Sequence, residues 1–409
     1  MLLKNIQELL QIRPSSQRWV AGADMQELPS LRDAYLVTKG EKIAAFGPMR
    51  DCPASYDGET LDASGRLVLP AWCDSHTHLV YAGDRSGEWL DRVKGLSYAE
   101  IAAKGGGILN SARVLNATPE DELYVQSSRR LERIIRHGTG AVEIKSGYGL
   151  TVEGELKMLR VIRRLAENYP VRVKATFLGA HALPAAFADD KDAYLRLLLE
   201  ELLPRIHAEG LADYVDIFCE EGYFSVADTE RMLEAGQRYG LPGKVHVNQF
   251  NALGGVKAAV TNGALSVDHL EELTAEDVAT LEGSQTIPVA LPGCSFFLGI
   301  PYTPARRLLD AGLPLALATD FNPGSAPSGN MFFAVMLACT QMKMLPAEAI
   351  NAATLNGAYA MGLEDEVGSI TVNKRANLLV TKPVASLATL PYSFGDDHLE
   401  HVILNGHRI

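Results

Sequence analysis

The hydrophobic and polar positions follow different periods at the two ends and in the middle of the chain. Both ends consist of short apolar runs separated by turn residues, as in residues 34–47, where two runs flank a Lys-Gly pair and predict a hairpin. Residues 368–380 predict strand, turn and strand, and residues 401–409 turn at Asn405-Gly406, a favoured hairpin turn. These patterns predict one small β domain built from both termini.

The middle of the chain alternates apolar runs of strand length with patterns of helical period, which is typical of βαβ units. One of the helical patterns covers residues 226–239, with Ser225 as its expected cap. Eight strand-like runs end in or near the following residues, most of them polar: His76 and His78, 145–148, 179–181, 219–221, 246–249, 268–269, 291–293 and 319–324. Eight such units predict a (β/α)8 barrel, whose active site lies at the carboxyl ends of the strands.

The fold class predicted is therefore α/β, a (β/α)8 TIM-like barrel with a small β-sandwich domain formed by both termini. We expect the barrel to span residues 67–363 and the composite β domain to comprise residues 1–66 and 364–409. A chain of 409 residues exceeds what one simple core usually organises, but a large α/β barrel accommodates it.

The composition argues against nucleic-acid and membrane partners. The formal net charge of −12 argues against a nucleic-acid surface and against a polybasic membrane patch. The first residues lack the pattern of a secretory signal, and the most apolar later stretch, 287–301, is too short and too broken by Pro and Gly to span a bilayer. The five cysteines are scattered and contain no Cys-x-x-Cys pair, which suits a reducing compartment. We therefore expect a cytoplasmic protein with no membrane and no nucleic-acid partner.

The strongest candidate chemistry is His76-Thr77-His78. Alternate side chains of a strand share a face, so these two imidazoles point the same way and supply half of a metal site. His246 and Asp320 lie at the ends of two other predicted strands. Alone, His246 is readily explained as a core histidine and Asp320 as a turn residue, but three imidazoles and one carboxylate at one barrel mouth predict a divalent metal ion, Zn²⁺ or Fe²⁺.

Five motifs carry a resemblance to known proteins: HTHLVYAGDR (76–85), KSGYGL (145–150), TFLGAH (176–181), DIFCEEG (216–222) and ATDFNPGS (318–325). On these motifs the chain resembles the amidohydrolase superfamily and, within it, the imidazolonepropionase family, over nearly its whole length. The resemblance implies a homodimer that hydrolyses the ring of 4-imidazolone-5-propanoate to N-formimidoyl-L-glutamate. It assigns the metal to His76, His78, His246 and Asp320. It places around substrate and product Arg85, Tyr148, His181, Gln249, Asn322, Gly324 and Ser325.

These assignments agree with the chemistry of the side chains. The implied substrate carries a carboxylate, for which Arg85 offers a planar fork, although a surface salt bridge is the alternative. A cyclic amide needs fixed donors and acceptors, which neutral His181 and Gln249 can supply, while His181 can equally be an ordinary loop histidine. Tyr148 follows a glycine that lets the loop approach a ligand; otherwise it is a packed loop tyrosine.

Two residues are expected to carry the proton chemistry. His269, at the end of the sixth predicted strand, is the candidate proton handler or oxyanion donor, with a core histidine as the alternative. Asp320 can bind the metal and also accept a proton from the attacking water.

The fifth-strand motif departs from the expected pattern. Relatives usually have an acidic residue at Asn248, and related deaminases have a proton-shuttling glutamate at Gln249. Glutamine cannot shuttle a proton, which disfavours deamination. Binuclear relatives usually take a bridging lysine from the fourth strand, where this chain has residues 219–221, so one metal is expected. The alternatives are a hydrolase or deaminase of another small cyclic amide or amidine, and a non-catalytic scaffold.

Overall fold

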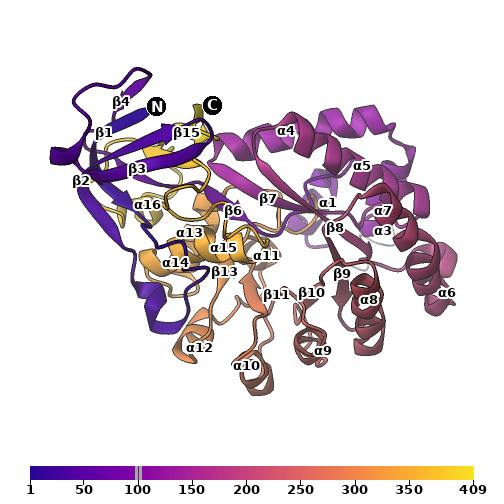
Figure 1. Ribbon diagram of the computed structural model, residues 1–409. Coiled ribbons are helices and arrows are strands. Elements are labelled where there is room, and N and C mark those ends of the chain that lie inside the picture. Colours follow the sequence, from indigo (N-terminus) through magenta and orange to yellow (C-terminus); the bar gives the residue numbers. More distant parts are fainter. Residues whose placement is uncertain (97–99, 101–103) are drawn as a thin grey trace.

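The computed structural model describes residues 1–96, 100 and 104–409, which form two sheets (Figure 1). The first sheet has the order β16-β15-β14-β5-β1-β2-β3, and β4 also pairs with β1. Its strands are β1 (Leu2–Leu10), β2 (Ser30–Lys39), β3 (Lys42–Pro48), β4 (Thr60–Asp62), β5 (Leu67–Pro70), β14 (Leu378–Thr381), β15 (Leu399–Leu404) and β16 (His407–Arg408). Figure 1 shows both termini on this sheet, as predicted.

This terminal sheet folds over its own hydrophobic core. Strands from both ends of the chain share one buried cluster, which includes Leu36, Leu378 and Ile403. The segment before β14 contacts the edge strand β3, where the backbone N–H of Ile43 donates to the carbonyl of Lys374 at 2.9 Å. The predicted hairpins at β2-β3 and β15-β16 are confirmed. Within residues 368–380 only β14 is a strand, because the first half contributes just an isolated bridge at Ile370.

The second sheet is the predicted barrel, with eight parallel strands in sequential order. Its strands are β6 (Trp72–Asp74), β7 (Thr139–Lys145), β8 (Arg172–Ala180), β9 (Tyr214–Cys219), β10 (Lys244–Val247), β11 (Ser266–His269), β12 (Ile287–Ala290) and β13 (Ala316–Leu317). The residues after β13 and β6 close the barrel, since Thr77 bridges Phe321 and Asp320 N–H donates to the His76 carbonyl at 3.0 Å. The closure therefore sets two candidate metal ligands side by side.

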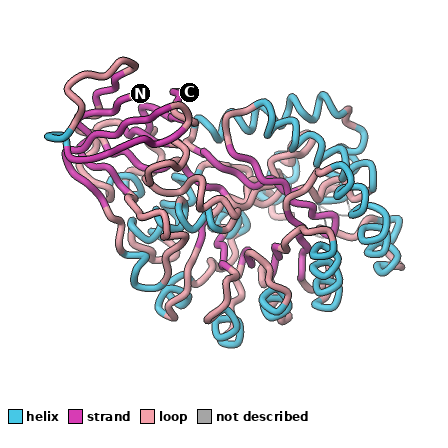
Figure 2. Tube along the Cα trace, in the orientation of Figure 1, coloured by secondary structure: helices cyan, strands magenta, loops and turns pink. Residues whose placement is uncertain are grey.

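Helices surround the barrel (Figure 2). They are α1 (Ser86–Val93), α3 (Ile108–Ala117), α4 (Glu120–Arg136), α5 (Val152–Asn168), α6 (Lys191–Arg196), α7 (Leu203–Glu209), α8 (Val226–Arg238), α9 (Gly255–Thr261), α10 (Ala275–Leu281), α11 (Pro292–Leu298), α12 (Ala305–Asp310), α13 (Met331–Thr340), α14 (Pro346–Ala353) and α15 (Leu355–Tyr359), with α16 (Thr389–Tyr392) beside the terminal sheet. Helix α8 begins where predicted, because Ser225 and Asp228 form a capping box. It ends one residue before the predicted limit.

The chain passes from one sheet to the other at Ala71. Strand β5 pairs with β1 and β14 in the terminal sheet, and β6 then pairs with β7 in the barrel. The domain limits 1–66, 67–363 and 364–409 remain a proposal. Strand β5 lies within the range 67–363 but pairs with the terminal sheet.

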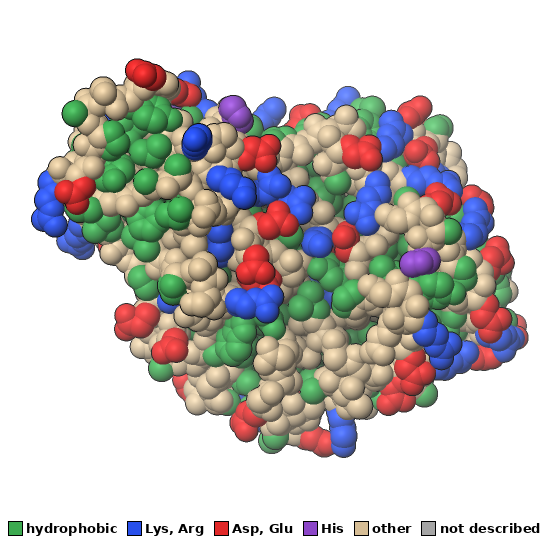
Figure 3. Space-filling view, viewed as in Figure 1, with side chains coloured by type: hydrophobic (Ala, Val, Ile, Leu, Met, Phe, Trp, Pro, Cys, Tyr) green, Lys and Arg blue, Asp and Glu red, His purple; other side chains and the backbone are tan. Residues whose placement is uncertain are grey.

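The surface carries both signs of charge. On the face in Figure 3, Lys and Arg side chains alternate with Asp and Glu side chains, so neither sign forms a continuous field there. Among the residues that the structure describes, no helix is both long enough and apolar enough to span a membrane.

Candidate metal centre and active-site cavity

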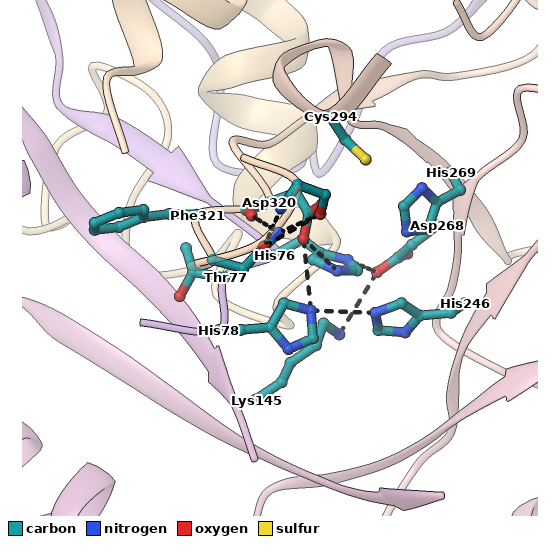
Figure 4. A network of polar contacts seen from close by, with 12 residues as sticks. His76, Thr77, His78, Lys145, His246, Asp268, His269, Cys294, Asp320 and Phe321 are labelled. Carbon is teal, nitrogen blue, oxygen red and sulfur yellow. Dashed lines mark hydrogen bonds and ion pairs between the residues drawn. The ribbon is translucent and has the colours of Figure 1, made fainter. Parts of the chain in front are cut away.

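Four side chains at the barrel mouth converge on one point (Figure 4). The Nε2 atoms of His76 and His78 lie 3.6 and 3.5 Å from Oδ1 of Asp320, and His246 Nε2 lies 3.3 Å from His78 Nε2. A tetrahedral zinc ion with bonds of about 2.0–2.1 Å has neighbouring ligand atoms about 3.3 Å apart. The spacing of His76, His78 and Asp320 therefore fits a single divalent ion, and His246 joins this set through its contact with His78.

The protonation of these groups also fits a metal. Burial lowers the pKa of His76 and of His78 well below the usual value, so both imidazoles are neutral, which is the form that binds metals. Nε2 of His76 is buried and has no hydrogen-bond partner among the described residues. Burial raises the pKa of Asp320, and a cation beside this carboxylate would favour its ionised form.

Two buried carboxylates hold the outer nitrogens of the histidines. Asp268 Oδ2 lies 2.6 Å from Nδ1 of His76, and Asp216 Oδ2 lies 3.0 Å from Nδ1 of His246. Lys145 stands behind both, with Nζ 2.8 Å from Asp216 and 3.6 Å from Asp268. Carboxylates in this position fix the tautomer and leave Nε2 free for the metal.

The charges of Lys145, Lys244 and the four carboxylates nearest to them and to the candidate ligands balance with one divalent ion. Lys145 contacts Glu143 at 2.6 Å, and Lys244 contacts the same carboxylate. Burial alone lowers the pKa of Lys145, but the carboxylates of Asp216 and Glu143 raise it overall, so it stays charged. Two lysines against Glu143, Asp216 and Asp268 leave one negative charge, and Asp320 makes two. One ion of charge +2 neutralises the set.

A cavity of about 640 Å³ opens above these groups. His78, His246, His269 and Asp320 line it, while His76 is fully buried below. Every residue that the resemblance placed around substrate also lines it: Arg85, Tyr148, His181, Gln249, Asn322, Gly324 and Ser325. Residues from six separate strand ends thus meet in one space.

Arg85 is placed at the cavity wall by two contacts. Its Nε and Nη2 lie 2.7 and 2.6 Å from Oε2 of Glu88, and the pair is largely buried. A Cβ on Gly324 would lie 2.1 Å from Nη1 of Arg85, so the guanidinium in this position occupies space that a side chain at residue 324 would take. Arg85 is therefore paired, but within the cavity and not on the outer surface.

His181 lies over the candidate metal centre. Its ring stacks on that of His78 at 5.1 Å and 15°, and Nδ1 lies 3.2 Å from the carbonyl of Gly147. Burial lowers the pKa of His181 to about 3, so the ring is neutral near pH 7 and offers one donor and one acceptor. Burial raises the pKa of Tyr148, which keeps its hydroxyl protonated.

His269 borders the same centre from β11. Its ring centroid lies 5.8 Å from that of His76 and 5.5 Å from that of His246. Its Nδ1 is 3.4 Å from Oε1 of Glu271. Burial alone would lower the pKa of His269, but Glu271 raises it overall. The ring is thus close enough to act on a group at the metal or to bind the metal itself.

Asn248 points away from this space. Its Nδ2 donates to the Glu272 carbonyl at 2.9 Å and to Asp277 Oδ2 at 3.0 Å, at the start of α10. Its φ of +56° is one that asparagine tolerates better than most residues. This unexpected residue therefore supports a turn, and only its neighbour Gln249 faces the cavity.

Several residues at the site carry no sequence signal strong enough to have predicted them. Glu88, Trp89 and Arg92 of α1 and Phe297 and Leu298 of α11 line the cavity, but nothing in their spacing marks a site. Glu220, which could have been a plain helix-start residue, accepts a hydrogen bond from Phe250 N–H at 2.9 Å and fixes the loop after β10. Asp216 and Asp268 could have been noticed as acidic residues inside apolar strands.

Comparison with known proteins gives consistent matches. The model of the amidohydrolase family matches residues 67–409. The chain is 60% identical to a curated imidazolonepropionase of Flavobacterium johnsoniae over 405 residues, which cover 99% of this chain and 98% of that protein. It is 39% identical to the imidazolonepropionase of Geobacillus thermodenitrificans over 99% of this chain and 97% of that one. An adenosine deaminase structure from Xanthomonas campestris with bound zinc matches 100% of this chain and 92% of its own, at a TM-score of 0.73 and 18% identity, a likeness of fold.

Proposed function

This chain belongs to the amidohydrolase family, and on that premise we propose that it uses one divalent metal ion, zinc or iron(II), to hydrolyse 4-imidazolone-5-propanoate to N-formimidoyl-L-glutamate. The protein is a hydrolase that acts on C–N bonds, with a role in histidine degradation. The observation that carries the choice of substrate is 60% identity to an imidazolonepropionase over 99% of the chain.

In this proposal, the metal is held by His76, His78, His246 and Asp320. The spacing of their ligand atoms and the charge of the surrounding groups support this assignment. When bound, such an ion lowers the pKa of a coordinated water toward about 7 and polarises a carbonyl group.

The remaining cavity residues orient the substrate. The guanidinium of Arg85 binds the propanoate carboxylate, with Glu88 holding its other edge. Neutral His181 and the amide of Gln249 offer donors and acceptors to the ring. Asn322 Oδ1 accepts hydrogen bonds from Gly324 N–H at 2.8 Å and Ser325 N–H at 2.7 Å, and so shapes the loop against the ligand.

The ring opens by addition of water and cleavage of one C–N bond. The water oxygen bonds to the ring carbonyl carbon, that carbon separates from the ring nitrogen, and one water proton ends on the nitrogen. Asp320 accepts the proton of the attacking water, and His269 supports the charge on the carbonyl oxygen or delivers the proton. Gln249 holds the ring without taking part in proton transfer.

A substrate panel tests this proposal against its rivals. Metal-loaded protein is given imidazolonepropanoate, an imidazolone that lacks the carboxylate, cytosine and guanine. We expect the highest kcat/KM with imidazolonepropanoate and a large loss without the carboxylate, because Arg85 then has no partner. Preferred turnover of cytosine or guanine would identify a deaminase, and no turnover of any cyclic amide would favour a scaffold.

The number of metal ions is a separate prediction. We expect close to one divalent transition metal per chain, because one ion neutralises the buried charges around His76, His246 and Asp320. Elemental analysis of dialysed protein measures the ratio. Two tightly bound metals per chain would contradict the mononuclear assignment.

We further infer a cytoplasmic homodimer without nucleic-acid partners. The five free cysteines support a cytoplasmic location, and the net charge of −12 argues against a nucleic-acid partner. The family resemblance supports the dimer. Light scattering after size exclusion measures the mass, and a monomer at working concentration would contradict this inference.

A further inference from the structure

A second cluster of metal-binding side chains lies beside the cavity. It consists of His269 at the end of β11, Glu271 two residues later, and Cys294 in the first turn of α11. One ligand atom from each lies within 4.8 Å of the others, and all three residues are buried. Figure 4 shows the thiol of Cys294 pointing inward on the side of His269.

Glu271 is incompletely satisfied in this cluster. Its Oε1 lies 3.4 Å from His269 Nδ1 and 3.1 Å from the hydroxyl of Ser295. Its Oε2 is buried and has no hydrogen-bond partner in the part of the chain that the structure describes. Within that same part, no lysine or arginine forms an ion pair with Glu271. Among the described residues the charged partner of Glu271 is His269, and a bound cation would also satisfy the unpartnered Oε2.

We propose that His269, Glu271 and Cys294 form a second, weaker site for a thiophilic divalent ion such as Zn²⁺, which fills only in excess metal and inhibits the enzyme. Thiolate, imidazole and carboxylate are the three ligand types that zinc takes from proteins. On binding, the thiol of Cys294 loses its proton to solvent, and the thiolate and carboxylate together balance the ion.

The site differs from the candidate metal centre in its ligands and its charge. His269 borders both sites and Cys294 is hydrogen-bonded to Asp320, so the second ion would lie next to the first and take Glu271 and Cys294 as ligands of its own. Gln249 Nε2 lies 3.4 Å from Cys294 Sγ, so the sulfur lies directly behind Gln249, which lines the cavity together with His269.

Inhibition follows from the capture of His269, and this part rests on the proposed function. A ring bound to metal through Nδ1 is locked in one protonation state and cannot both accept and release a proton. Metal binding at the second site, in contrast, does not depend on what the enzyme hydrolyses.

Cobalt(II) is the probe for binding. Protein loaded with one equivalent of Co²⁺ is titrated with more, while near-ultraviolet absorption reports thiolate-to-cobalt charge transfer and equilibrium dialysis reports the ratio. We expect a thiolate band to grow with a second equivalent in wild type and in Cys339→Ser, the matched control at a cysteine outside the site. Cys294→Ser and Glu271→Gln should bind the second ion at least about tenfold more weakly, and the first of these should lose the band. Retention of the first equivalent shows that each variant is folded.

Inhibition by zinc is then measured as the rate of imidazolonepropanoate hydrolysis. The rate of each variant in excess zinc is compared with the rate of the same variant without excess metal. We expect inhibition by excess Zn²⁺ in wild type and in Cys339→Ser, and at least about tenfold weaker inhibition in Cys294→Ser. Absence of the band and of a second equivalent in wild type, or an unchanged band in Cys294→Ser, would overturn the site. A second ion with a thiolate band in a protein that hydrolyses no imidazolone would keep the site and reject the proposed function.

Discussion

Arg85 and Gly324 show how single residues shape one wall of the cavity. The guanidinium occupies the space left by the missing Cβ of Gly324, and Glu88 holds the edge that includes Nε. The remaining edge can meet a carboxylate through two parallel hydrogen bonds, a geometry that an ammonium group cannot reproduce. The identity of the cation thus matters as much as its charge.

Arg85→Lys tests this geometry. We expect KM to rise about ten- to hundredfold, which corresponds to losing about 1.5–3 kcal/mol of charge-assisted hydrogen bonding, while metal content stays the same. Steady-state kinetics and elemental analysis on one preparation measure both. Arg113→Lys, at a guanidinium that pairs with Asn110, is the matched control. Wild-type kinetics in Arg85→Lys would remove this residue from the substrate site.

His269→Ala separates proton chemistry from metal binding. Positioned proton transfer contributes about 10²–10⁴-fold in rate, so we expect kcat to fall by that order with the metal retained. The measurement is kcat beside metal content for the same sample. If metal is lost in step with activity, His269 is a ligand; if neither changes, it takes no part.

At the scale of elements, buried ion pairs connect the ends of several barrel strands. Lys145 at the end of β7 faces Asp216 of β9 and Asp268 of β11, and these carboxylates hold His246 and His76. Burial alone raises the pKa of Asp216, but His246 and Lys145 lower it overall, so it remains ionised. One lysine therefore couples three strands to two candidate metal ligands.

A pair of lysine variants tests this coupling. Lys145→Met leaves the two supporting carboxylates without their cation, so we expect metal affinity to fall about ten- to hundredfold and stability to fall by about 3–5 kcal/mol. Lys244→Met removes an equally buried charge, but Lys244 contacts Glu143 and not Asp216 or Asp268. It should lose stability and keep metal affinity. Competition with a chelator and denaturant unfolding give the two quantities, and equal affinity in all three proteins would refute the coupling.

Sequence patterns predicted the helices and strands better than the residues that line the cavity. The eight strands, the hairpins and the start of α8 follow from period and turn chemistry, which are local properties. His76, His246 and Asp320 could be placed together because parallel strand ends meet at one face of a barrel. Trp89 and Phe297 could not, since helices reach the cavity only through tertiary packing. The role of Asn248 could not be derived from the sequence for a similar reason, because its partner Asp277 is positioned by the folded α10.

At the scale of the whole molecule, the chain passes from one sheet to the other just before the first candidate metal ligands. The chain leaves the terminal sheet after β5, forms β6 and reaches His76 and His78 within a few residues. Barrel closure at Thr77 and Phe321 then brings Asp320 to them. Metal binding should therefore stabilise the fold as a whole, since the candidate ligands follow the first and the last strand of the barrel, where it closes.

The most direct test of the account is the conversion of freshly generated 4-imidazolone-5-propanoate, followed by loss of its ultraviolet absorbance and by the amount of N-formimidoyl-L-glutamate formed. We predict rapid conversion with one product per substrate, loss of activity when the metal is stripped, and recovery on adding one equivalent of zinc or iron(II) per chain. No acceleration over spontaneous decay by metal-loaded protein, or full activity in metal-free protein, would contradict it.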